Sequence, residues 1–536
     1  MPRGFPVVFP LLISLALAST SPHPLRDSLF KFLSPPACIL WLNNDGAVGC
    51  SQSEAVVEAP VRYFAANDPH TFLKQLADSS AAAAPWAVVI EPSMLADPTI
   101  LHALSATSNI AGLAIAHAPS FPSSFSPADK FSDRSCSNQE FLWNPAGLNL
   151  LGSAFNYTVV QLNSSETSLL LELAHANQAR GVFDGCSSCA RNVLQLRYEM
   201  FASGSSSLSC LESDTCKPIG GFSPWATIGS GPDLVVLTTA FDSAALFQDL
   251  SQGSLSSPAA AAVVLAVAEL FAAVADSLSQ KTLVVLLAQA DSWSRSGTAR
   301  WWSALKSSPC PPTELETVKL TNGELYEICK APYRMNPRSY ELLNRGSVTA
   351  TLEVQQPGLF SQRNLFLHVG CSPTPQVSRA AELIASAANI SIVQGTPLPP
   401  SSVRDVFRIQ NPAYPSPVEN SFVIAGFERE FQSAYFHSQY DSPELISAAS
   451  LCDAVQTVAK ATSQLLGIPV PPSASAFVAK CLGHVRRSCL YAYVFVYALC
   501  HSCNNVFQLN FTCFYFSVVS KHNQTFALAC STSSTP

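Results

Sequence analysis

Two long apolar runs in the middle of the chain predict neighbouring strands of a parallel sheet. Residues 233–240 and 281–288 are almost continuously apolar and rich in Val and Leu, and an alanine-rich stretch lies between them. Strands buried on both faces of a parallel sheet show this pattern, whereas a strand with one exposed face alternates apolar and polar residues. We therefore predict a strand–helix–strand unit with its helix at 258–278 and a right-handed crossover.

Further patterns place this unit in a larger α/β fold. Strands predicted at 365–369 and 421–425 and a helix predicted at 446–466 would enlarge the same sheet, and the prolines of 469–472 end the helix. Earlier in the chain, short apolar runs alternate with helical patterns and predict a smaller lobe, with a helix at 69–76 and strands at 86–90, 110–115 and 158–162. The predicted fold class is α/β, with a mostly parallel sheet covered by helices and a smaller α/β lobe.

The N-terminus has a different character. Arg3, an apolar run and the small residues Ala16 and Ala18 predict a signal peptide at 1–18 that directs the chain into the secretory pathway. A membrane anchor is the alternative, but the run is too short to span a bilayer as a helix. We divide the rest of the chain into a small lobe at 30–165, a cysteine-rich connecting segment at 166–229, a large lobe at 230–480 and a cysteine-rich tail at 481–536.

Cysteines and sequons agree with export from the cytosol. The chain has 17 cysteines, and we expect several disulfides in an oxidising compartment. Cys186 and Cys189 form a C-x-x-C motif, which we interpret as a structural bridge because no second pair has zinc-finger spacing. Five N-x-S/T sequons are candidate glycosylation sites, at Asn156, Asn163, Asn389, Asn510 and Asn523.

Composition excludes several classes of function. Of 536 residues, 48% are hydrophobic and 12% are charged, which indicates a folded chain rather than a disordered one. The formal net charge is -7 and no long basic run occurs, so nucleic acid is not an expected partner. Two other apolar runs are not predicted to span a membrane, because Glu269 falls within the run at 258–274 and the run at 490–499 is too short.

Acidic residues follow two of the predicted strands. Asp242 and Asp291 come shortly after the runs at 233–240 and 281–288, and in α/β sheets the carboxyl ends of the strands line the ligand crevice. Together with His437 in the sequence HSQYD, this arrangement resembles the fold of the di-zinc aminopeptidases.

That resemblance stops at the metal ligands. Two zinc ions need about five ligands, but Ala240 stands at the His position of the family's H-x-D pair, and no carboxylate follows that would bridge the metals. The position of the paired glutamates holds Asp291 preceded by Ala290. We therefore expect an aminopeptidase-like large lobe with no metal, no cofactor and no catalytic residue.

Several segments resemble the nicastrin family, which has a peptidase-like fold without metals. Across residues 30 to 470 they are IAGLAI at 110–115, FSP at 125–127, EFLWNPAGLNL at 140–150, PLPPSS at 397–402 and FQSAYFHSQYDS at 431–442. The resemblance implies a non-catalytic subunit of the γ-secretase complex, which admits type I membrane proteins with short ectodomains and excludes bulky ones. It also implies a presenilin-type intramembrane protease and the other γ-secretase subunits as partners, and a location in the ER, Golgi or plasma membrane.

The resemblance further implies a site for the free amino end of a substrate. An acidic residue of the family is assigned to it, and Asp291 takes its place here, where a carboxylate would bind an ammonium group through charge-assisted hydrogen bonds. The family's Asp-Tyr-Ile-Gly-Ser motif falls on 294–298, of which only Gly297 is kept. Arg295 would pair with Asp291 and occupy it, so steric exclusion is the expected mechanism. The candidate substrate-binding residues are Asp291, Arg295, Asp242 and His437, although we expect an ordinary hydrogen-bonded histidine at the last position.

Alternatives to this function remain. A secreted zinc-dependent exopeptidase would use Asp242, Asp291 and His437, and a soluble decoy would bind receptors without the membrane complex. The tail departs from the family, which continues into a transmembrane helix, because residues 483–536 contain five cysteines and no Asp or Glu. We interpret this tail as an alternative or mispredicted end that lacks the transmembrane helix.

Overall fold

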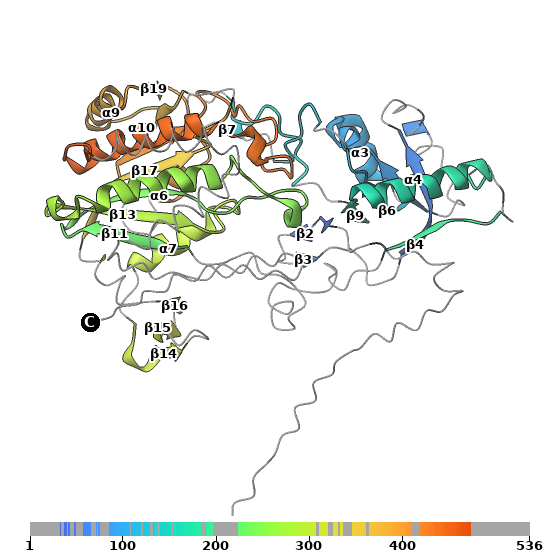
Figure 1. Cartoon of the computed structure of the whole chain (residues 1–536), viewed down its shortest axis with the longest axis horizontal. Coiled ribbons are helices and arrows are strands. Elements are labelled where there is room, and N and C mark those ends of the chain that lie inside the picture. Colours follow the sequence, from blue (N-terminus) through green and yellow to red (C-terminus); the bar gives the residue numbers. More distant parts are fainter. Residues whose placement is uncertain are drawn as a thin grey trace, which may run out of the picture. The chain divides into compact units, whose positions relative to one another are not determined.

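The computed structural model (Figure 1) describes most of the chain between residues 37 and 472. The described residues are 37–39, 41–42, 48–49, 57–65, 85–107, 109–118, 122–128, 132–133, 140–151, 157–183, 189–196, 223–306, 310–319, 325–330, 333–335, 346–360, 364–409 and 417–472, with single positions at 33, 71, 73, 74, 136, 155, 186 and 343. The predicted signal peptide, the predicted tail and the sequons at Asn156, Asn510 and Asn523 lie outside them.

The central element of the larger part is a seven-stranded sheet in the order β11-β13-β12-β17-β20-β18-β19. Its inner strands pair in parallel, and the pairs β11 with β13 and β18 with β20 are antiparallel. The strands are β11 (Trp225–Gly229), β12 (Asp233–Ala240), β13 (Lys281–Ala288), β17 (Ser347–Gln355), β18 (Phe366–Gly370), β19 (Ser391–Gln394) and β20 (Asn420–Ala425). The predicted strand–helix–strand unit is confirmed, because β12 and β13 are parallel neighbours.

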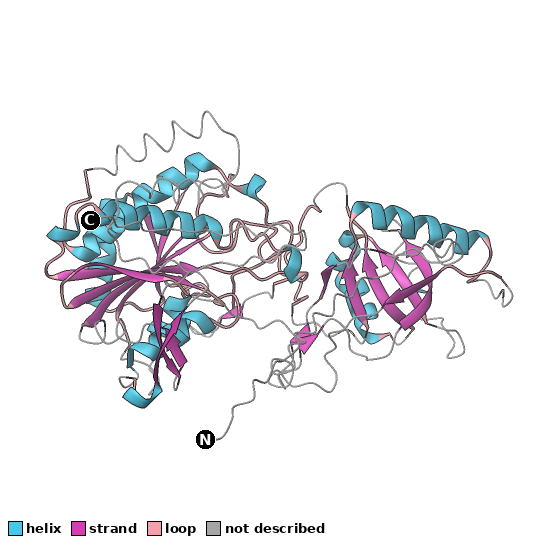
Figure 2. Ribbon diagram, turned by 60° about the horizontal axis from the view of Figure 1, so that its bottom comes forward, coloured by secondary structure: helices cyan, strands magenta, loops and turns pink. Residues whose placement is uncertain are grey.

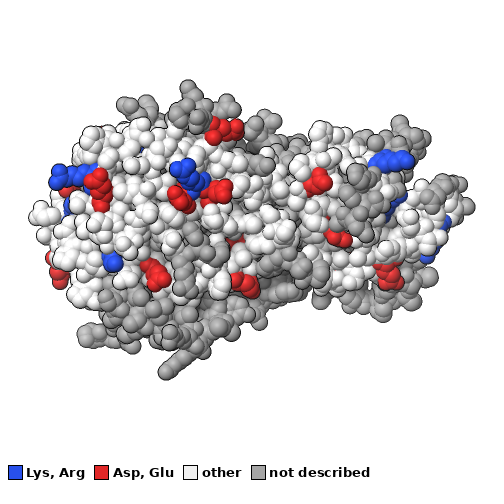
Figure 3. Space-filling model, turned by 90° about the horizontal axis from the view of Figure 1, so that it is seen from above, with Lys and Arg blue, Asp and Glu red and all other residues white. Residues whose placement is uncertain are grey.

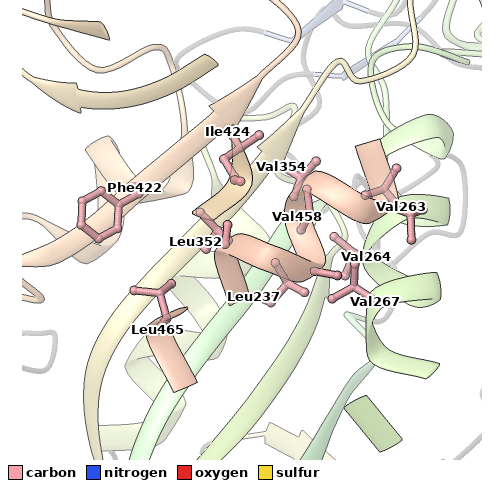
Figure 4. Close-up of a cluster of buried hydrophobic side chains, with 14 of the residues drawn as sticks. Leu237, Val263, Val264, Val267, Leu352, Val354, Phe422, Ile424, Val458 and Leu465 are labelled. Carbon is pink, nitrogen blue, oxygen red and sulfur yellow. The ribbon is translucent and has the colours of Figure 1, made fainter. Parts of the chain in front are cut away.

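Helices cover both faces of this sheet because its strands are apolar on both. Val235 and Leu237 of β12 pack into one hydrophobic cluster with the helices of the first face. Figure 4 shows this cluster, in which Val263 and Val267 come from one helix and Val458 from another. The helices of this face are α6 (Pro258–Ala272), α9 (Pro375–Ala388) and α10 (Ala448–Leu466), with the short turn η3 (Ala275–Ser277) after α6. The helix predicted at 258–278 therefore ends at residue 272.

The opposite face buries the alternate residues of the same strands. Leu234 and Val236 pack with Trp301 and Trp302 of α7 (Ser296–Lys306) and with the π-helical turn η5 (Val403–Phe407). Side chains of a strand point alternately to the two faces of a sheet, so one apolar run supplies two separate cores.

A second, six-stranded sheet has the order β1-β9-β6-β5-β4-β10. Four central strands pair in parallel, and the two edge strands are antiparallel. The strands are β1 (Ala37–Cys38), β4 (Val57–Phe64), β5 (Trp86–Ile90), β6 (Ile110–Ile115), β9 (Thr158–Gln161) and β10 (Val193–Leu196), and the helical elements are η1 (Pro92–Ala96), α3 (Pro98–Ala106) and α4 (Ser164–Ala179). The sheet thus continues past residue 165, because its edge strand β10 lies at 193–196, and α4 packs against β4. Figure 2 shows the strands and helices of both sheets.

A buried asparagine ties α4 to this sheet. Asn177 is 0% exposed, and its side-chain amide donates hydrogen bonds to the carbonyl oxygens of Val61 (2.9 Å) and Asn192 (2.8 Å). Its Oδ1 accepts the backbone N–H of Asn192 at 2.7 Å. One side chain therefore anchors β4 and the entry to β10 together.

Three small sheets and several disulfides complete the described structure. The small sheets are β2 (Trp41–Leu42) with β3 (Val48–Gly49), β7 (Ser132–Asp133) with β8 (Phe141–Leu142), and β14 (Leu315–Lys319), β15 (Leu325–Lys330) and β16 (Tyr333–Met335). Disulfides join Cys136 to Cys371, Cys186 to Cys189 and Cys310 to Cys329, so the prediction of disulfides is confirmed. Within the described part of the chain, no helix is both long and apolar enough to cross a membrane.

Candidate functional site

The loops after three adjacent parallel strands meet at one edge of the large sheet. β13, β12 and β17 are neighbours with the same direction, so their carboxyl ends lie together. Asp242 follows β12, Asp291 follows β13, and Glu353 lies near the end of β17. We call these three residues the carboxyl cluster.

The side chain of Asp291 is buried and is fixed by hydrogen bonds from other residues of the chain. Its carboxyl is 1% exposed and accepts the backbone N–H of Thr298 at 2.8 Å and the hydroxyl of the same residue at 2.6 Å. The hydroxyl of Ser402 donates a third hydrogen bond, at 2.6 Å. Asp291 therefore joins the start of α7 to the segment that precedes η5, and its oxygens are already occupied.

Asp242 is more accessible than Asp291, because its side chain is only partly buried. It accepts the backbone N–H of Asp291 at 2.7 Å and that of Ser292 at 3.2 Å, and the Ser292 hydroxyl donates to its backbone carbonyl. Burial raises the pKa of Asp242 to about 6, against the lowering effect of the Ser292 N–H, and the nearby charge of Asp291 raises it further. The Asp242 side chain therefore fixes the turn after β13.

Glu353 completes the cluster and was missed by the sequence analysis. It is 1% exposed, and its two oxygens accept the Gln355 amide at 2.7 Å and the Val403 backbone N–H at 3.1 Å. Burial raises its pKa to about 7, the charge of Arg295 opposes this shift, and Asp291 adds to it. The available signal was a single acid inside the otherwise uncharged strand SVTATLEVQ.

Arg295 does not pair with the carboxyl of Asp291, so this prediction was wrong. Its guanidinium donates to the backbone carbonyl of Asp291 at 3.1 Å, and its Nε lies 3.6 Å from the carboxylate of Asp405. Asp405 also pairs with Arg404, at 2.6 Å. The reason is that Thr298 and Ser402 already surround the Asp291 carboxyl, while the backbone at Arg295 has a left-handed φ of 57°.

His437 lies in the segment 431–442 and stacks on its neighbour. The ring centroids of Phe436 and His437 are 3.8 Å apart with an interplanar angle of 20°. Burial, followed by the charge of Arg295, lowers the pKa of His437 to about 3, so the imidazole is neutral. Among the described contacts, no hydrogen bond joins this ring to Asp242 or Asp291.

The residues of this edge do not fit a pair of zinc ions. Ala240 supplies no ligand, and the carboxyl oxygens of Asp291 and Glu353 already accept hydrogen bonds from protein donors. Among the described residues, no group of three or more His, Cys, Asp or Glu side chains is arranged to hold a metal ion. The hydrogen bonds of these carboxyl groups instead fix the loops after β12 and β13 against η5.

Asp441 is a further residue that the sequence analysis did not single out as a site. It is 0% exposed, and its carboxyl accepts the backbone N–H groups of Leu255 (2.9 Å) and Ser256 (3.0 Å) and the Ser256 hydroxyl (2.5 Å). The Ser254 N–H donates to its backbone carbonyl at 2.9 Å. Asp441 therefore binds the loop that enters α6 to the segment that carries His437.

Comparisons with known proteins agree with this architecture. The family models of the nicastrin small lobe and the nicastrin large lobe match residues 37–202 and 233–468. A nicastrin from Arabidopsis thaliana is 24% identical over 480 residues, which cover 84% of this chain and 65% of the relative. A nicastrin from Dictyostelium purpureum is 21% identical, with 84% of this chain and 68% of the relative covered.

A solved structure shows the same fold. The crystal structure of the gamma-secretase component nicastrin superimposes with a TM-score of 0.60 at 19% identity, and the match covers 83% of this chain and 77% of the other. Since the two lobe models match most of the chain in the order in which its two large sheets occur, the chain belongs to the nicastrin family.

Proposed function

We propose that this chain acts as a non-catalytic subunit of a γ-secretase complex that gates type I membrane proteins for intramembrane proteolysis. Its family membership supports this role, because a solved relative is described as a gamma-secretase component. The carboxyl cluster is the observation that supports a non-catalytic role. Its buried members, Asp291 and Glu353, already accept hydrogen bonds from protein groups and fix the neighbouring loops. The partners in this proposal are a presenilin-type protease, the other subunits of the complex and the substrates, with no cofactor.

Within this proposal, selection works by steric exclusion rather than by capture of a substrate amine at Asp291. An ammonium group would have to displace the Ser402 or Thr298 hydroxyl from a side chain that is 1% exposed. The free-energy cost of removing water from the ammonium group would offset much of the free energy gained by forming the new ion pair. A folded ectodomain that admits short substrate ends and blocks bulky ones needs no such contact.

Co-purification tests the assignment to the complex. The full chain with an epitope tag is expressed in cells that lack their own family member, and their membranes are solubilised in mild detergent. We expect a presenilin-type protease to be recovered with the tag and cleavage of a short-ectodomain substrate to be restored, but not that of the same substrate with a bulky ectodomain. Loss of both results would contradict the proposal, and tightly bound zinc with release of amino acids from peptides would favour an exopeptidase.

A substitution at Asp291 separates steric exclusion from amine capture. Asn keeps the shape of the side chain and one acceptor for the Thr298 N–H, so Asp291→Asn is expected to lower the free energy of unfolding by about 1 kcal/mol. Substrate cleavage should stay within twofold of that of the unchanged chain. The measurement compares cleavage of two substrates that differ only in a free or an acetylated amino terminus. A selective loss of the free-amine substrate would show that Asp291 binds the amine.

The proposal places the chain in the secretory pathway, where two described sequons would carry glycans. Asn163 is exposed at the N-cap of α4, where its Oδ1 accepts the Glu166 N–H at 2.9 Å and the Ser165 hydroxyl at 2.7 Å. Asn389 is exposed at the C-cap of α9 with a φ of 56°. Because a glycan is attached to the side-chain nitrogen, the cap at Asn163 is compatible with glycosylation.

Ser165→Ala is expected to remove the glycan of Asn163 and to keep the helix cap. Asn163→Gln should remove both and lower the free energy of unfolding by about 1 kcal/mol more than Ser165→Ala does, because the N-cap is lost. Peptide mass spectrometry of the exported chain measures occupancy, and thermal unfolding measures stability. An unmodified Asn163 peptide in the unchanged chain would contradict the prediction.

A further inference from the structure

The large sheet ends in a short strand, β19, at one edge. Within the described part of the chain, β19 is last in the strand order and pairs only with β18, in parallel. α9 packs against it, and the two lie together at one end of the sheet (Figure 1). The outer side of an edge strand carries backbone N–H and C=O groups that can pair with a strand of another chain. β19 therefore offers an edge to which a strand of another molecule can bind.

β19 lacks the residues that commonly protect an edge strand. Its sequence, SIVQ, contains no charged residue and no proline, both of which oppose pairing at an edge. The bulge in its pairing with β18 lies between His368 and Gly370, so the extra residue belongs to β18. Just after β19, a side-chain carbon placed on Gly395 would meet no described atom within 4 Å beyond its chain neighbours. Neither β19 itself nor the residue that follows it shields this edge.

A sequon begins directly before this edge. Asn389 is exposed at the C-cap of α9 with a left-handed φ of 56°, and Ser391, the third residue of the sequon, is the first residue of β19. Among the described contacts, no hydrogen bond involves the side-chain amide of Asn389, so attachment of a sugar to its nitrogen breaks none of them. Two residues of fully extended chain span at most about 7 Å. A glycan on Asn389 would therefore lie at the start of the β19 edge.

We propose that a glycan on Asn389 prevents β19 from pairing with β19 of a second copy of the chain. Two copies related by a two-fold axis would align these strands antiparallel and join their large sheets into one. The strand carries no charge, so no like charges within it oppose this contact. A bulky, hydrated oligosaccharide attached at the start of the strand excludes the second copy from the edge. The inference rests on the proposed location in the secretory pathway, where such glycans are added.

Two substitutions at one position test the role of this glycan. Ser391→Ala removes the sequon, whereas Ser391→Thr keeps it. The full chains are purified from a secretory expression host, glycan occupancy is measured by peptide mass spectrometry, and size-exclusion chromatography with light scattering follows the molar mass over a concentration series. We expect the Ala chain to dimerise at a concentration about tenfold lower than the Thr chain, because pairing of the free edges adds backbone hydrogen bonds.

Two results would overturn this inference. One is an unmodified Asn389 in the unchanged chain. The other is equal association of the Ala and Thr chains when the Thr chain carries the glycan. The second result leaves the γ-secretase proposal intact, because that proposal is tested separately by co-purification.

Further variants separate the loss of this glycan from other effects. Asn389→Gly also removes the sequon and keeps the left-handed C-cap, so it should associate as the Ser391→Ala chain does. Ser165→Ala removes the sequon at Asn163 and should leave association unchanged. Association of the Ser165→Ala chain to the same degree would show that any lost glycan has this effect, and would refute a specific role of Asn389.

A charge on the edge and hydrogen exchange locate the contact. Gln394 is exposed in β19, and adding Gln394→Lys to the Ser391→Ala chain is expected to restore the monomer, because lysine on an edge strand opposes pairing. Amide hydrogen exchange of residues 391–394 should slow when the Ser391→Ala chain dimerises. Dimers that persist with Gln394→Lys, or slower exchange only in other segments, would place the contact outside β19 and refute the proposal.

Discussion

Asp441→Ala is expected to lower the free energy of unfolding by about 3 kcal/mol. The substitution leaves the N–H groups of Leu255 and Ser256 without their acceptor at the entry to α6. Buried donors without a partner cost more than the net value of a hydrogen bond, because they have lost water as well. Chemical denaturation of the full chain measures the loss.

Variants at two positions make this result specific. Asp441→Asn keeps the volume and one acceptor oxygen, so its loss should be smaller than that of the Ala variant. Asp453 is exposed on α10, and Asp453→Ala should change the free energy of unfolding by less than about 0.5 kcal/mol. Equal, small losses at Asp441 and Asp453 would mean that the contacts of Asp441 with the 254–256 loop contribute nothing to stability.

Glu353→Gln is expected to change how stability depends on pH. The pKa of Glu353 rises from 4.5 in the unfolded chain to about 7 in the fold because of burial. A carboxyl with a raised folded pKa stabilises the fold fully below its unfolded pKa, and this contribution is lost as the pH rises through the folded value. Relative to the unchanged chain, the Gln variant should therefore gain about 2 kcal/mol between pH 5 and pH 8.

The comparison between variant and unchanged chain removes the contribution of other titrating groups. Burial lowers the pKa of His368 to about 4 and that of His437 to about 3, so both histidines destabilise the fold as the pH falls below 6.5. Asp242 changes the pH dependence of stability in the same direction as Glu353, because its pKa is also raised, to about 6. These effects occur in both chains and cancel in the difference. The exposed Glu382 of α9 provides a surface control, since Glu382→Gln should change the free energy of unfolding by less than about 0.5 kcal/mol.

Figure 3 shows one face of the molecule with its charged residues coloured, of which the chain has few, since 12% of its residues are charged. On the face seen in Figure 3, acidic and basic residues are scattered and separated by broad uncharged areas. The described Lys and Arg side chains on that face do not gather into one patch.

The strands of the large sheet could be predicted from the sequence because burial on both faces requires apolar residues within the strand itself. The segments 233–240 and 281–288 match β12 and β13 to the residue, since a strand buried on both faces must be apolar throughout. The segments 365–369 and 421–425 match β18 and β20 to within one residue. The predicted helix at 446–466 begins two residues later, at Ala448.

The carboxyl cluster was only partly predictable. Asp242 and Asp291 could be placed at the edge of the sheet because each follows an obvious strand. Glu353 could not, because its position depends on β17 pairing with β12 in parallel, and those strands lie far apart in the sequence. The pairing of Arg295 with Asp405 and of Cys136 with Cys371 likewise joins residues from distant segments.

The sequence by itself determined the α/β class, the two-sided burial of β12 and β13, the two aspartates at their ends and the resemblance to the nicastrin family. Each of these depends on residues that are close together in the chain. The tertiary structure alone decided which donors surround each buried carboxyl: Thr298 and Ser402 at Asp291, Val403 at Glu353, and Leu255 and Ser256 at Asp441. A carboxyl leaves water only where folding brings such donors to it, and strand order and register, rather than local composition, determine which donors those are.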